Sequence, residues 1–455
     1  MLVGTLALAG AALAHRFANG AIRTRQAGKL ARSSAVARLV ADAGAPISAV
    51  TGVRFALEPG RGRTAVPVRS AILGTILAVV IVTATLTFGS GLNTLVSHPA
   101  LYGWNWDYAI SSNFLVPRES WALLDKDPDV AGWSGDSFAN AQIDNVTVPI
   151  LLAGVHAHVT PALLSGHNLD AGNQIVLGAA TLAQLHKHIG DTVLVSYGTP
   201  KDAPVYVPPT RLHIVGTATL PAVGSPQTLH TSMGTGAIVP ESIEPPEFQK
   251  FLTSPDPTLN GPSIAFVRLK PGVSRAGGLA NLRHIAEVGD KAFLAVPNGG
   301  AAGASVTVLG VQYPAEIENY KTIGDTPLFL AAGLAIAAIV ALGLTLIASV
   351  RRRRRDLALL KSLGFSTWQL TATIASQASV IAVIGAFVGI PLGIALGRWL
   401  WVEFAHGIYA VPLATVPVLP LVIVGLGTLA LANVLAALPG RYAARTPTAL
   451  VLRAE

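Results

Sequence analysis

The chain has 455 residues, of which 51% are hydrophobic and 12% are charged, and its formal net charge is +8. A soluble globular chain carries about 25% charged residues, so this composition indicates a membrane protein. The chain contains no cysteine, which excludes disulfide bonds, cysteine-ligated zinc, iron–sulfur clusters and a thiol nucleophile.

The first 14 residues, MLVGTLALAGAALA, are apolar but shorter than the roughly 20 residues that a spanning helix needs. The run ends in Ala-Leu-Ala, which resembles a signal-peptidase site. However, no basic residue precedes it, and cleavage would leave the basic segment that follows outside the cell. We therefore favour the end of a truncated transmembrane helix over a signal peptide.

Four later stretches have the length and composition of spanning helices, and a polar region of domain size separates the first from the second. The expected order is a partial transmembrane helix at 1–14, a basic cytoplasmic segment at 15–69, a transmembrane helix at 70–91, an extracytoplasmic α/β domain at 92–326, a transmembrane helix at 327–350, a cytoplasmic coupling region at 351–368, a transmembrane helix at 369–400, an external loop at 401–414, a transmembrane helix at 415–438 and a cytoplasmic tail at 439–455.

The charges predict how these segments are oriented. Residues 92–326 contain 12 Lys and Arg against 19 Asp and Glu, a net charge of −7, whereas the rest of the chain contains 20 against 5 and carries +15. Short Lys/Arg-rich segments beside spanning helices remain in the cytoplasm. Alternating spans place the basic segments 15–69, 351–361 and 441–453 together on that side, and the acidic domain outside.

The polar region predicts a mixed α/β fold. Strand-like runs occupy 146–155, 192–197, 211–220, 263–269 and 304–310, and helix-like runs occupy 179–188 and 274–288. In LYGWNWDY we expect Trp104, Trp106 and Tyr108 to form an aromatic belt at the membrane surface, with a substrate contact as the alternative.

Motifs for catalysis and cofactor binding are absent from the sequence. There is no G-x-x-x-x-G-K-[ST] phosphate loop, no G-x-S-x-G elbow and no H-E-x-x-H motif, so we expect no catalytic residues and no ATP hydrolysis by this chain. The pairs His156/His158 and His186/His188 lack a third ligand in sequence, and we expect no metal or other cofactor. The expected spans carry no charged residue or histidine at their centres, which disfavours an ion-coupled carrier.

Glycine recurs every four residues in GAFVGIPLGIALG, at Gly385, Gly389, Gly393 and Gly397. This spacing aligns the glycines on one helix stripe, where another backbone can approach closely. The stripe predicts helix packing, and packing within the bundle and a dimer seam are both open. Pro391 predicts a local kink, because it removes a helical hydrogen bond.

Five consecutive arginines follow the span at 327–350 and predict a topology anchor at anionic lipid headgroups. The next segment, DLALLKSLGF, predicts a short amphipathic helix with Asp356 at its start and Gly364 at its end. Its apolar face needs either lipid headgroups or a protein groove.

The arginine segment resembles a signature of FtsX/MacB-like ABC transporter permeases, in which a basic cluster and an acidic residue precede A-L-L-[KR]-x-L-G. The tail LPGRYAARTPTALVLRAE resembles the closing motif P-x-R-x-A-R-x-x-P-x-x-A-L-R-x-E, with one more residue before the final arginine. Residues 174–195 and 211–218 resemble segments of the outer domain of these permeases.

The resemblance implies an α-helical transmembrane bundle with an inserted mixed α/β extracytoplasmic domain, in the bacterial plasma membrane. It implies a separate cytoplasmic ABC ATPase, on which the short helix docks, and no nucleic-acid partner. The residues that would couple to the ATPase are Arg351, Arg352, Arg353, Arg354, Arg355, Asp356, Leu357, Leu359, Leu360, Lys361, Leu363 and Gly364.

The resemblance also implies a dimeric or pseudo-dimeric arrangement with a second permease half or a homodimer partner. Residues 52–69 resemble the lead-in to the second half of ten-helix permeases, so we expect a C-terminal half. The alternative function is a membrane-tethered extracytoplasmic binding or regulatory module without an ATPase partner. The sequence does not indicate a substrate.

Overall fold

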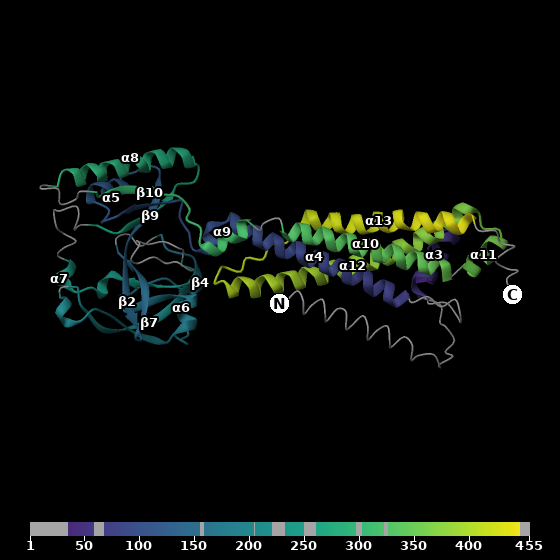
Figure 1. Cartoon of the computed structure of the whole chain (residues 1–455), viewed down its shortest axis with the longest axis horizontal. Coiled ribbons are helices and arrows are strands. Elements are labelled where there is room, and N and C mark those ends of the chain that lie inside the picture. The colour runs from purple at the N-terminus through teal and green to yellow at the C-terminus, as the bar shows by residue number, and fades with distance from the viewer. Residues whose placement is uncertain are drawn as a thin grey trace. The chain divides into compact units, whose positions relative to one another are not determined.

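The computed structural model describes residues 35–58, 68–154, 159–203, 205–220, 233–249, 261–296, 303–322, 326–352 and 354–445. The chain divides into two compact units, which are described separately. The helical unit comprises residues 1–90, 325–400 and 415–455, and the α/β unit comprises residues 91–324 and 401–414. Figure 1 labels the elements of both. The expected partial helix at 1–14 lies outside the described residues and stays a prediction.

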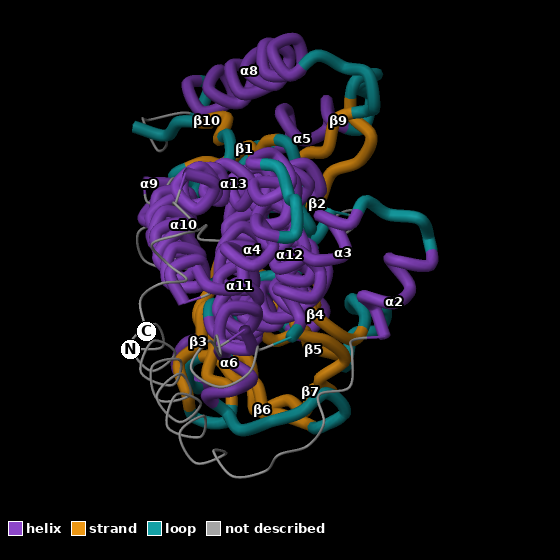
Figure 2. The backbone as a smooth tube through the Cα atoms, turned by 90° about the vertical axis from the view of Figure 1, so that its right-hand side faces the viewer, coloured by secondary structure: helices purple, strands orange, loops and turns teal. Residues whose placement is uncertain are grey.

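The helical unit is built from long apolar helices with shorter helices beside them. Its described elements are α2 (Ala35–Asp42), α3 (Ile47–Leu57), α4 (Val68–Ser97), α10 (Thr326–Arg352), α11 (Arg354–Ser362), α12 (Thr367–Gly407) and α13 (Val418–Arg445). Judged on described residues alone, α4, α12 and α13 are long and apolar enough to cross a membrane. Figure 2 shows α4, α10, α12 and α13 nearly end-on and grouped together.

Helix α12 is longer than the span expected at 369–400. It has 41 residues and continues through residues 401–407, where we expected an external loop. The apolar pattern continues there, since Trp401 and Ala405 lie four residues apart on one helix face and are both fully buried. Pro391 lies inside the helix without ending it. The loop to α13 therefore begins after Gly407.

The glycine stripe of α12 lies directly against α4. A Cβ atom added at any of the four glycines would come within 2.5 to 2.8 Å of an α4 atom. The facing α4 side chains also recur every four positions, at Thr75, Val79, Thr83 and Thr87, and the backbone of Ala84 faces Gly397 as well. Side chains cannot approach this closely, so glycine is what allows the two backbones to meet. Packing within the chain thus accounts for the stripe, and this face is not available for a dimer seam.

Helix α3, in the segment expected to be basic and cytoplasmic, packs on the helical bundle. A Cβ atom added at Gly52 would lie 2.5 Å from the Cβ atom of Ser376 and 2.6 Å from the carbonyl oxygen of Thr373, both on α12. Phe55 packs against a buried cluster that α10, α11, α12 and α13 share. Part of the segment at 15–69 is therefore an integral layer of the helical unit.

The α/β unit combines a mixed sheet with peripheral helices. Its described strands are β1 (Tyr108–Ser112), β2 (Val130–Ile143), β3 (Val146–Ala153), β4 (Leu163–Gly166), β5 (Gln174–Gly178), β6 (Thr192–Tyr197), β7 (Val207–Ala218), β8 (Ala237–Pro240), β9 (Ile264–Leu269) and β10 (Val306–Leu309). Its described helices are η2 (Pro99–Tyr102), α5 (Arg118–Leu124), α6 (Ala179–Gln184), η3 (Pro200–Asp202), η4 (Glu241–Ile243), α7 (Pro246–Gln249), α8 (Arg275–Leu294) and α9 (Ala315–Thr322). The prediction of a mixed α/β fold for this region is confirmed.

Six of the described strands close into a ring. The strand order is β10-β1-β9-β2-β3-β8-β5-β7-β4, and β6 pairs with both β2 and β7. The pairs β3–β8 and β5–β7 are parallel, and the other pairs of the ring are antiparallel. The ring therefore runs β2-β3-β8-β5-β7-β6 and back to β2, which makes a small closed barrel.

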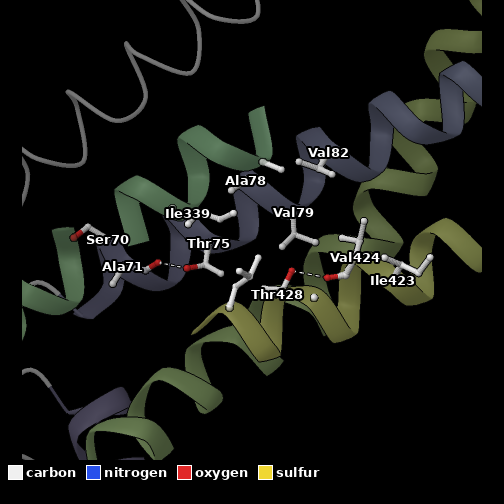
Figure 3. A pocket seen from close by; sticks show the side chains of 14 residues that line it. Ser70, Ala71, Thr75, Ala78, Val79, Val82, Ile339, Ile423, Val424 and Thr428 are labelled. Carbon is white, nitrogen blue, oxygen red and sulfur yellow. Dashed lines mark hydrogen bonds between the residues drawn. The ribbon is translucent and has the colours of Figure 1, made fainter. Parts of the chain in front are cut away.

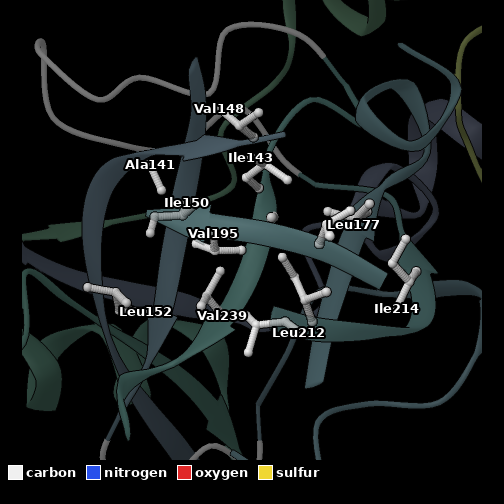
Figure 4. Close-up of a cluster of buried hydrophobic side chains, with 13 residues drawn as sticks. Ala141, Ile143, Val148, Ile150, Leu152, Leu177, Val195, Leu212, Ile214 and Val239 are labelled. Carbon is white, nitrogen blue, oxygen red and sulfur yellow. The ribbon is translucent and has the colours of Figure 1, made fainter. Parts of the chain in front are cut away.

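Alternate side chains of the ring strands fill its interior. Figure 4 shows this cluster, which includes Ile143 from β2, Ile150 from β3, Val195 from β6, Leu212 from β7 and Val239 from β8. Each strand contributes every second residue, as the pleat requires. A second core lies between the sheet and α8, around Trp133, Val267 and Leu282.

Two predictions for the α/β unit are wrong. The helix expected at 179–188 ends at Gln184, because the backbone turns to a left-handed conformation at His186, with a φ of 52°. The aromatic belt is not formed either, since Trp104 is 1% exposed and Trp106 6% exposed. The Trp106 ring stacks on Phe266 of β9, with ring centroids 3.8 Å apart, so these indoles belong to the core.

Three carboxylates with raised pKa values lie near one end of the ring. Asp136 on β2 is 3% exposed and accepts a hydrogen bond of 2.9 Å from the hydroxyl of Ser134. Burial raises the pKa of Asp136 to about 7, and Glu241 adds to this effect. Burial also raises the pKa of Glu244 to about 7, again with a contribution from Glu241, and raises the pKa of Glu241 itself. This end of the ring therefore favours protonated carboxyl groups.

We predict that the α/β unit loses stability as the pH rises from about 4 to about 7. In this window the folded state keeps protons on Asp136 and Glu244, whereas the unfolded chain releases them near pH 4. The folded state therefore binds more protons, and its stability falls as the pH increases. Asp136→Asn should raise the free energy of unfolding at pH 8 by about 2 kcal/mol and flatten the pH dependence.

Thermal unfolding of the full chain in detergent, followed across this pH range, measures the effect. Asp170→Asn, at an exposed carboxylate, is the control and should leave the profile unchanged. Stability that rises with pH, or an unchanged slope in Asp136→Asn, would contradict the prediction.

We predict that Gly393→Ala destabilises the helical unit by about 1–3 kcal/mol, because the added methyl group must displace Thr83 on α4. Gly427→Ala on α13 is the matched control, since a Cβ atom there meets nothing within 4 Å. That control should be neutral or slightly stabilising, because alanine favours helix over glycine. Melting temperatures of both variants in detergent measure the difference, and equal effects would contradict the seam as described.

Candidate functional site

The arginine anchor lies at the junction of α10 and α11. Arg351 and Arg352 form the last turn of α10 and are exposed. Arg353 lies outside the described residues, and Arg354 and Arg355 begin α11. Positive charge near a helix C-terminus interacts favourably with the helix dipole, so the first two arginines stabilise the end of α10.

Helix α11 has a start and a stop of its own. Asp356 lies in its first turn and Lys361 in its last, where each charge complements the helix dipole. After the helix, the N–H of Gly364 donates to the carbonyl of Lys361 at 3.2 Å, and the N–H of Phe365 donates to the carbonyl of Leu360 at 3.1 Å. Gly364 has a φ of 97°, so these bonds form a Schellman cap that favours glycine.

The leucines of α11 divide between two faces. Leu357 is 4% exposed and lies in the cluster shared with α10, α12 and α13, and Leu360 packs against that cluster. By contrast, Leu359 is 51% exposed, and Leu363, in the turn directly after α11, is 78% exposed. One face thus fixes α11 to the helical unit, and the other presents two leucines four residues apart. We call this second pair, Leu359 and Leu363, the α11 patch.

An exposed aromatic side chain follows the α11 patch in the sequence. Trp368, in the first turn of α12, is 76% exposed. Side chains of this size are seldom left in water without a role, and they are frequent anchors at protein interfaces and in membrane headgroups. The turn between α11 and α12 therefore carries apolar surface as well as charge.

A cavity of about 350 Å³ lies between α4, α10 and α13 (Figure 3). The residues described around it are all uncharged; they are Ser70, Ala71, Gly74, Thr75, Ala78, Val79, Val82, Ala335, Ile339, Ile423, Val424, Gly427, Thr428 and Leu431. The hydroxyl of Thr75 donates to the carbonyl of Ala71 at 3.0 Å, and that of Thr428 to the carbonyl of Val424 at 2.6 Å. With these hydroxyls bound to their own helices, the cavity suits apolar chains rather than ions.

The histidine pairs do not assemble into a site in the described part of the chain. His156 and His158 lie outside it, and His188 is exposed beside Asp191, 3.8 Å from its carboxylate. Among the described residues, no group of three or more His, Asp or Glu side chains could hold a metal ion.

Sequence reasoning found α11 and named Leu357 and Leu360, but it grouped them with the exposed leucines as residues that couple to an ATPase. Leu357 and Leu360 are three residues apart, and Leu359 and Leu363 are four residues apart. Both spacings place side chains on one face of a helix, so the sequence does not show which pair is buried. Gly52 was missed, because a single glycine in an apolar run has no neighbour in the sequence that reveals a close contact.

Comparison with known proteins gives one match by sequence family and further matches by structure. Residues 328–448 match the FtsX-like permease C-terminal family. No curated protein matches the chain. The periplasmic region of MacB from Actinobacillus actinomycetemcomitans aligns with 49% of this chain and 93% of its own, at 11% identity and a TM-score of 0.28.

The extracellular domain of the noncanonic ABC-type transporter YknZ from Gram-positive bacteria aligns with 44% of this chain and all of its own, at 8% identity and a TM-score of 0.26. Both scores are too low to support an argument, so the family match is the finding that bears on identity. It covers α10 to α13, including the arginine segment from which the resemblance was read. Over residues 328–448, the chain is similar to the FtsX-like permease C-terminal family.

Proposed function

We propose that this chain is the permease subunit of an ABC transporter, in which a separate cytoplasmic ATPase drives movement of the α/β unit. The family match and the apolar helices support a permease of this kind. The sequence itself has no phosphate loop, so ATP hydrolysis requires another protein. The observation that carries the proposal is the α11 patch, an exposed pair of leucines beside a block of arginines.

The packing of α11 is suited to transmitting force. A partner that pushes on Leu359 and Leu363 pushes on a helix whose opposite face is buried through Leu357. Because that buried cluster also contains residues of α10, α12 and α13, the displacement reaches several long helices together. A rigid, well-packed connection of this type is what a mechanical coupling needs.

The interior of the helical unit supports movement of helices rather than passage of an ion. The cavity between α4, α10 and α13 has no charged residue among those described, and its threonine hydroxyls are bound within their helices. Proton and ion pathways in membranes use ionisable side chains at depth. The proposal is therefore mechanotransmission, for export or extraction of a substrate or for control of an outer partner.

The charge distribution supports a multi-pass protein of the bacterial plasma membrane. The basic segments would face the cytoplasm and the anionic headgroups there, and the acidic α/β unit would face outward. A second permease half or a homodimer partner would complete the complex. Exposed apolar residues on α10 and α13, such as Phe329 and Leu426, offer surface for lipid or for such a partner.

The alternative is a membrane-tethered outer module that acts without an ATPase. It shares the orientation and the α/β unit but leaves the α11 patch without a partner. Dependence of an ATPase on this patch separates the two functions.

We predict that Leu359→Glu combined with Leu363→Glu weakens binding of the cognate ATPase at least about thirtyfold. Loss of a central apolar contact in an interface costs about 2 kcal/mol or more, which corresponds to roughly a thirtyfold weaker complex. Co-purification from membranes and the ATPase rate of the reconstituted complex measure the effect. Leu294→Glu, at an exposed leucine that ends α8, is the control. An ATPase that remains bound to the double variant would contradict the proposed coupling surface.

We predict that Asp170→Cys reacts with a membrane-impermeant thiol reagent from outside the plasma membrane, whereas Ser362→Cys reacts only after the membrane is opened. Both positions are exposed, and the natural chain has no cysteine that could react in the background. Labelling of Ser362→Cys in intact cells would reverse the orientation and remove the basis for a cytoplasmic partner.

A further inference from the structure

A cavity of about 480 Å³ opens at one end of the strand ring of the α/β unit. Residues from β2, β3, β6 and β7 line it, together with the segment that follows β8. The register agrees with this placement, since Ala139 pairs with Ile150, Leu152 with Val239, and Tyr197 with Val207. The mouth of a β-barrel is a common place for a small-molecule site, and this volume is in the usual range of about 300–1,000 Å³.

The floor of the cavity is apolar. Ala141, Ile150, Leu152 and Val195 line it and also belong to the buried cluster of the ring, as Figure 4 shows. Phe138 and Tyr197 add aromatic rings at its side. Surface of this kind binds the apolar or aromatic body of a ligand by removing it from water.

The charged groups of the cavity all have one sign. Glu241 and Glu244 line it from η4 and the residue after it, and none of its described lining residues is Lys, Arg or His. Within the described part of the chain, neither glutamate forms an ion pair with a basic side chain. Two partly buried carboxylates with no basic partner among the described residues are electrostatically unfavourable, and a cation beside them would relieve this.

The pKa directions agree with this picture. Burial raises the pKa of Glu244 to about 7, and the pKa of Glu241 also lies above its ordinary value. Asp136 is also buried, and its carboxyl group interacts with that of Glu241. The local environment thus disfavours further negative charge and favours any group that brings positive charge.

We propose that this cavity binds a hydrophobic cation, a small molecule with an apolar or aromatic body and one positive charge. The body would lie on the floor formed by the ring, and the charge would lie beside Glu241 and Glu244. A bare metal ion is less suited, because the remaining lining offers mostly carbon, and an anion would be repelled. The proposal concerns the α/β unit alone and goes beyond the proposed coupling to an ATPase.

Binding of tetraphenylphosphonium to the full chain in nanodiscs of neutral lipid tests the proposal. Equilibrium dialysis against empty nanodiscs corrects for partition into lipid. Tetraphenylborate, which has the same shape and the opposite charge, is the matched probe. We expect saturable binding of the cation and at least tenfold weaker binding of the anion.

Variants separate the contributions of charge and of apolar surface. Glu241→Gln combined with Glu244→Gln should weaken binding of the cation at least tenfold, whereas Glu287→Gln, at an exposed carboxylate on α8, should leave it unchanged. Ala139→Phe should weaken binding by filling the cavity while both carboxylates remain. The double glutamine variant removes charge repulsion, so its folding should be preserved, and its melting temperature checks this.

The proposal is overturned if the cation shows no binding above empty nanodiscs, if both probes bind equally, or if the double glutamine variant binds as the natural chain does. ATPase coupling is measured on the same preparations. If the cation does not bind but coupling to the ATPase is intact, only this inference is wrong. If coupling is absent but the cation binds as expected, only the proposed function is wrong.

Discussion

The close contact between α12 and α4 determines how the helical unit is organised. In lipid there is no water to drive apolar helices together, so association depends on the fit of their surfaces and on close approach of backbones. Four glycines on α12 meet a row of α4 residues at the same spacing of four, and an added Cβ atom would lie at most 2.8 Å from its neighbour. The seam fixes the relative rotation of the two helices, and it leaves the opposite face of α12, with Phe387 exposed, for lipid or another subunit.

Helix α11 also depends on packing against the long helices. A nine-residue helix is too short to be stable alone. It persists because Leu357 is buried against the long helices and because the Schellman cap at Gly364 satisfies its last carbonyls. Once the inward face is used for stability, only the outward face remains for a partner. A surface that is both exposed and rigidly supported can receive a force, which connects the packing of this helix to the proposed function.

Sequence patterns predicted elements where the local period matched the final environment. The run at 192–197 alternates along its length and became β6. The run at 263–269 is apolar except for Ser263 and Arg268 and became the buried β9. The strand β2 was missed because many of its residues, such as Asp136 and Asn140, are polar or small, and only pairing with β3, β6 and β9 makes it a strand. The position of Trp106 was misjudged because its stacking partner, Phe266, is far away in the sequence.

The candidate sites show the same limit. The arginines, α11 and the glycine stripe are local patterns, and reading them required only helical spacing. The inward and outward leucines could not be separated, because that difference depends on what α12 and α13 present to α11. The cavity of the ring could not be found at all, since Ala139 and Glu244 become neighbours only when β2, β3 and β8 pair.

Ionisable groups are distributed differently in the two units. The long helices keep ionisable groups away from their centres. Of the polar groups described there, Asn433 and Ser379 bond to each other across helices, whereas Thr75 and Thr428 bond to carbonyls of their own helices. Such helices can pack and move but offer little with which to recognise a polar ligand. The α/β unit holds buried carboxylates at the end of a strand ring, where the low local dielectric strengthens electrostatic interactions. Under the two proposals, recognition by charge would belong to the α/β unit, and transmission of movement would belong to the helices.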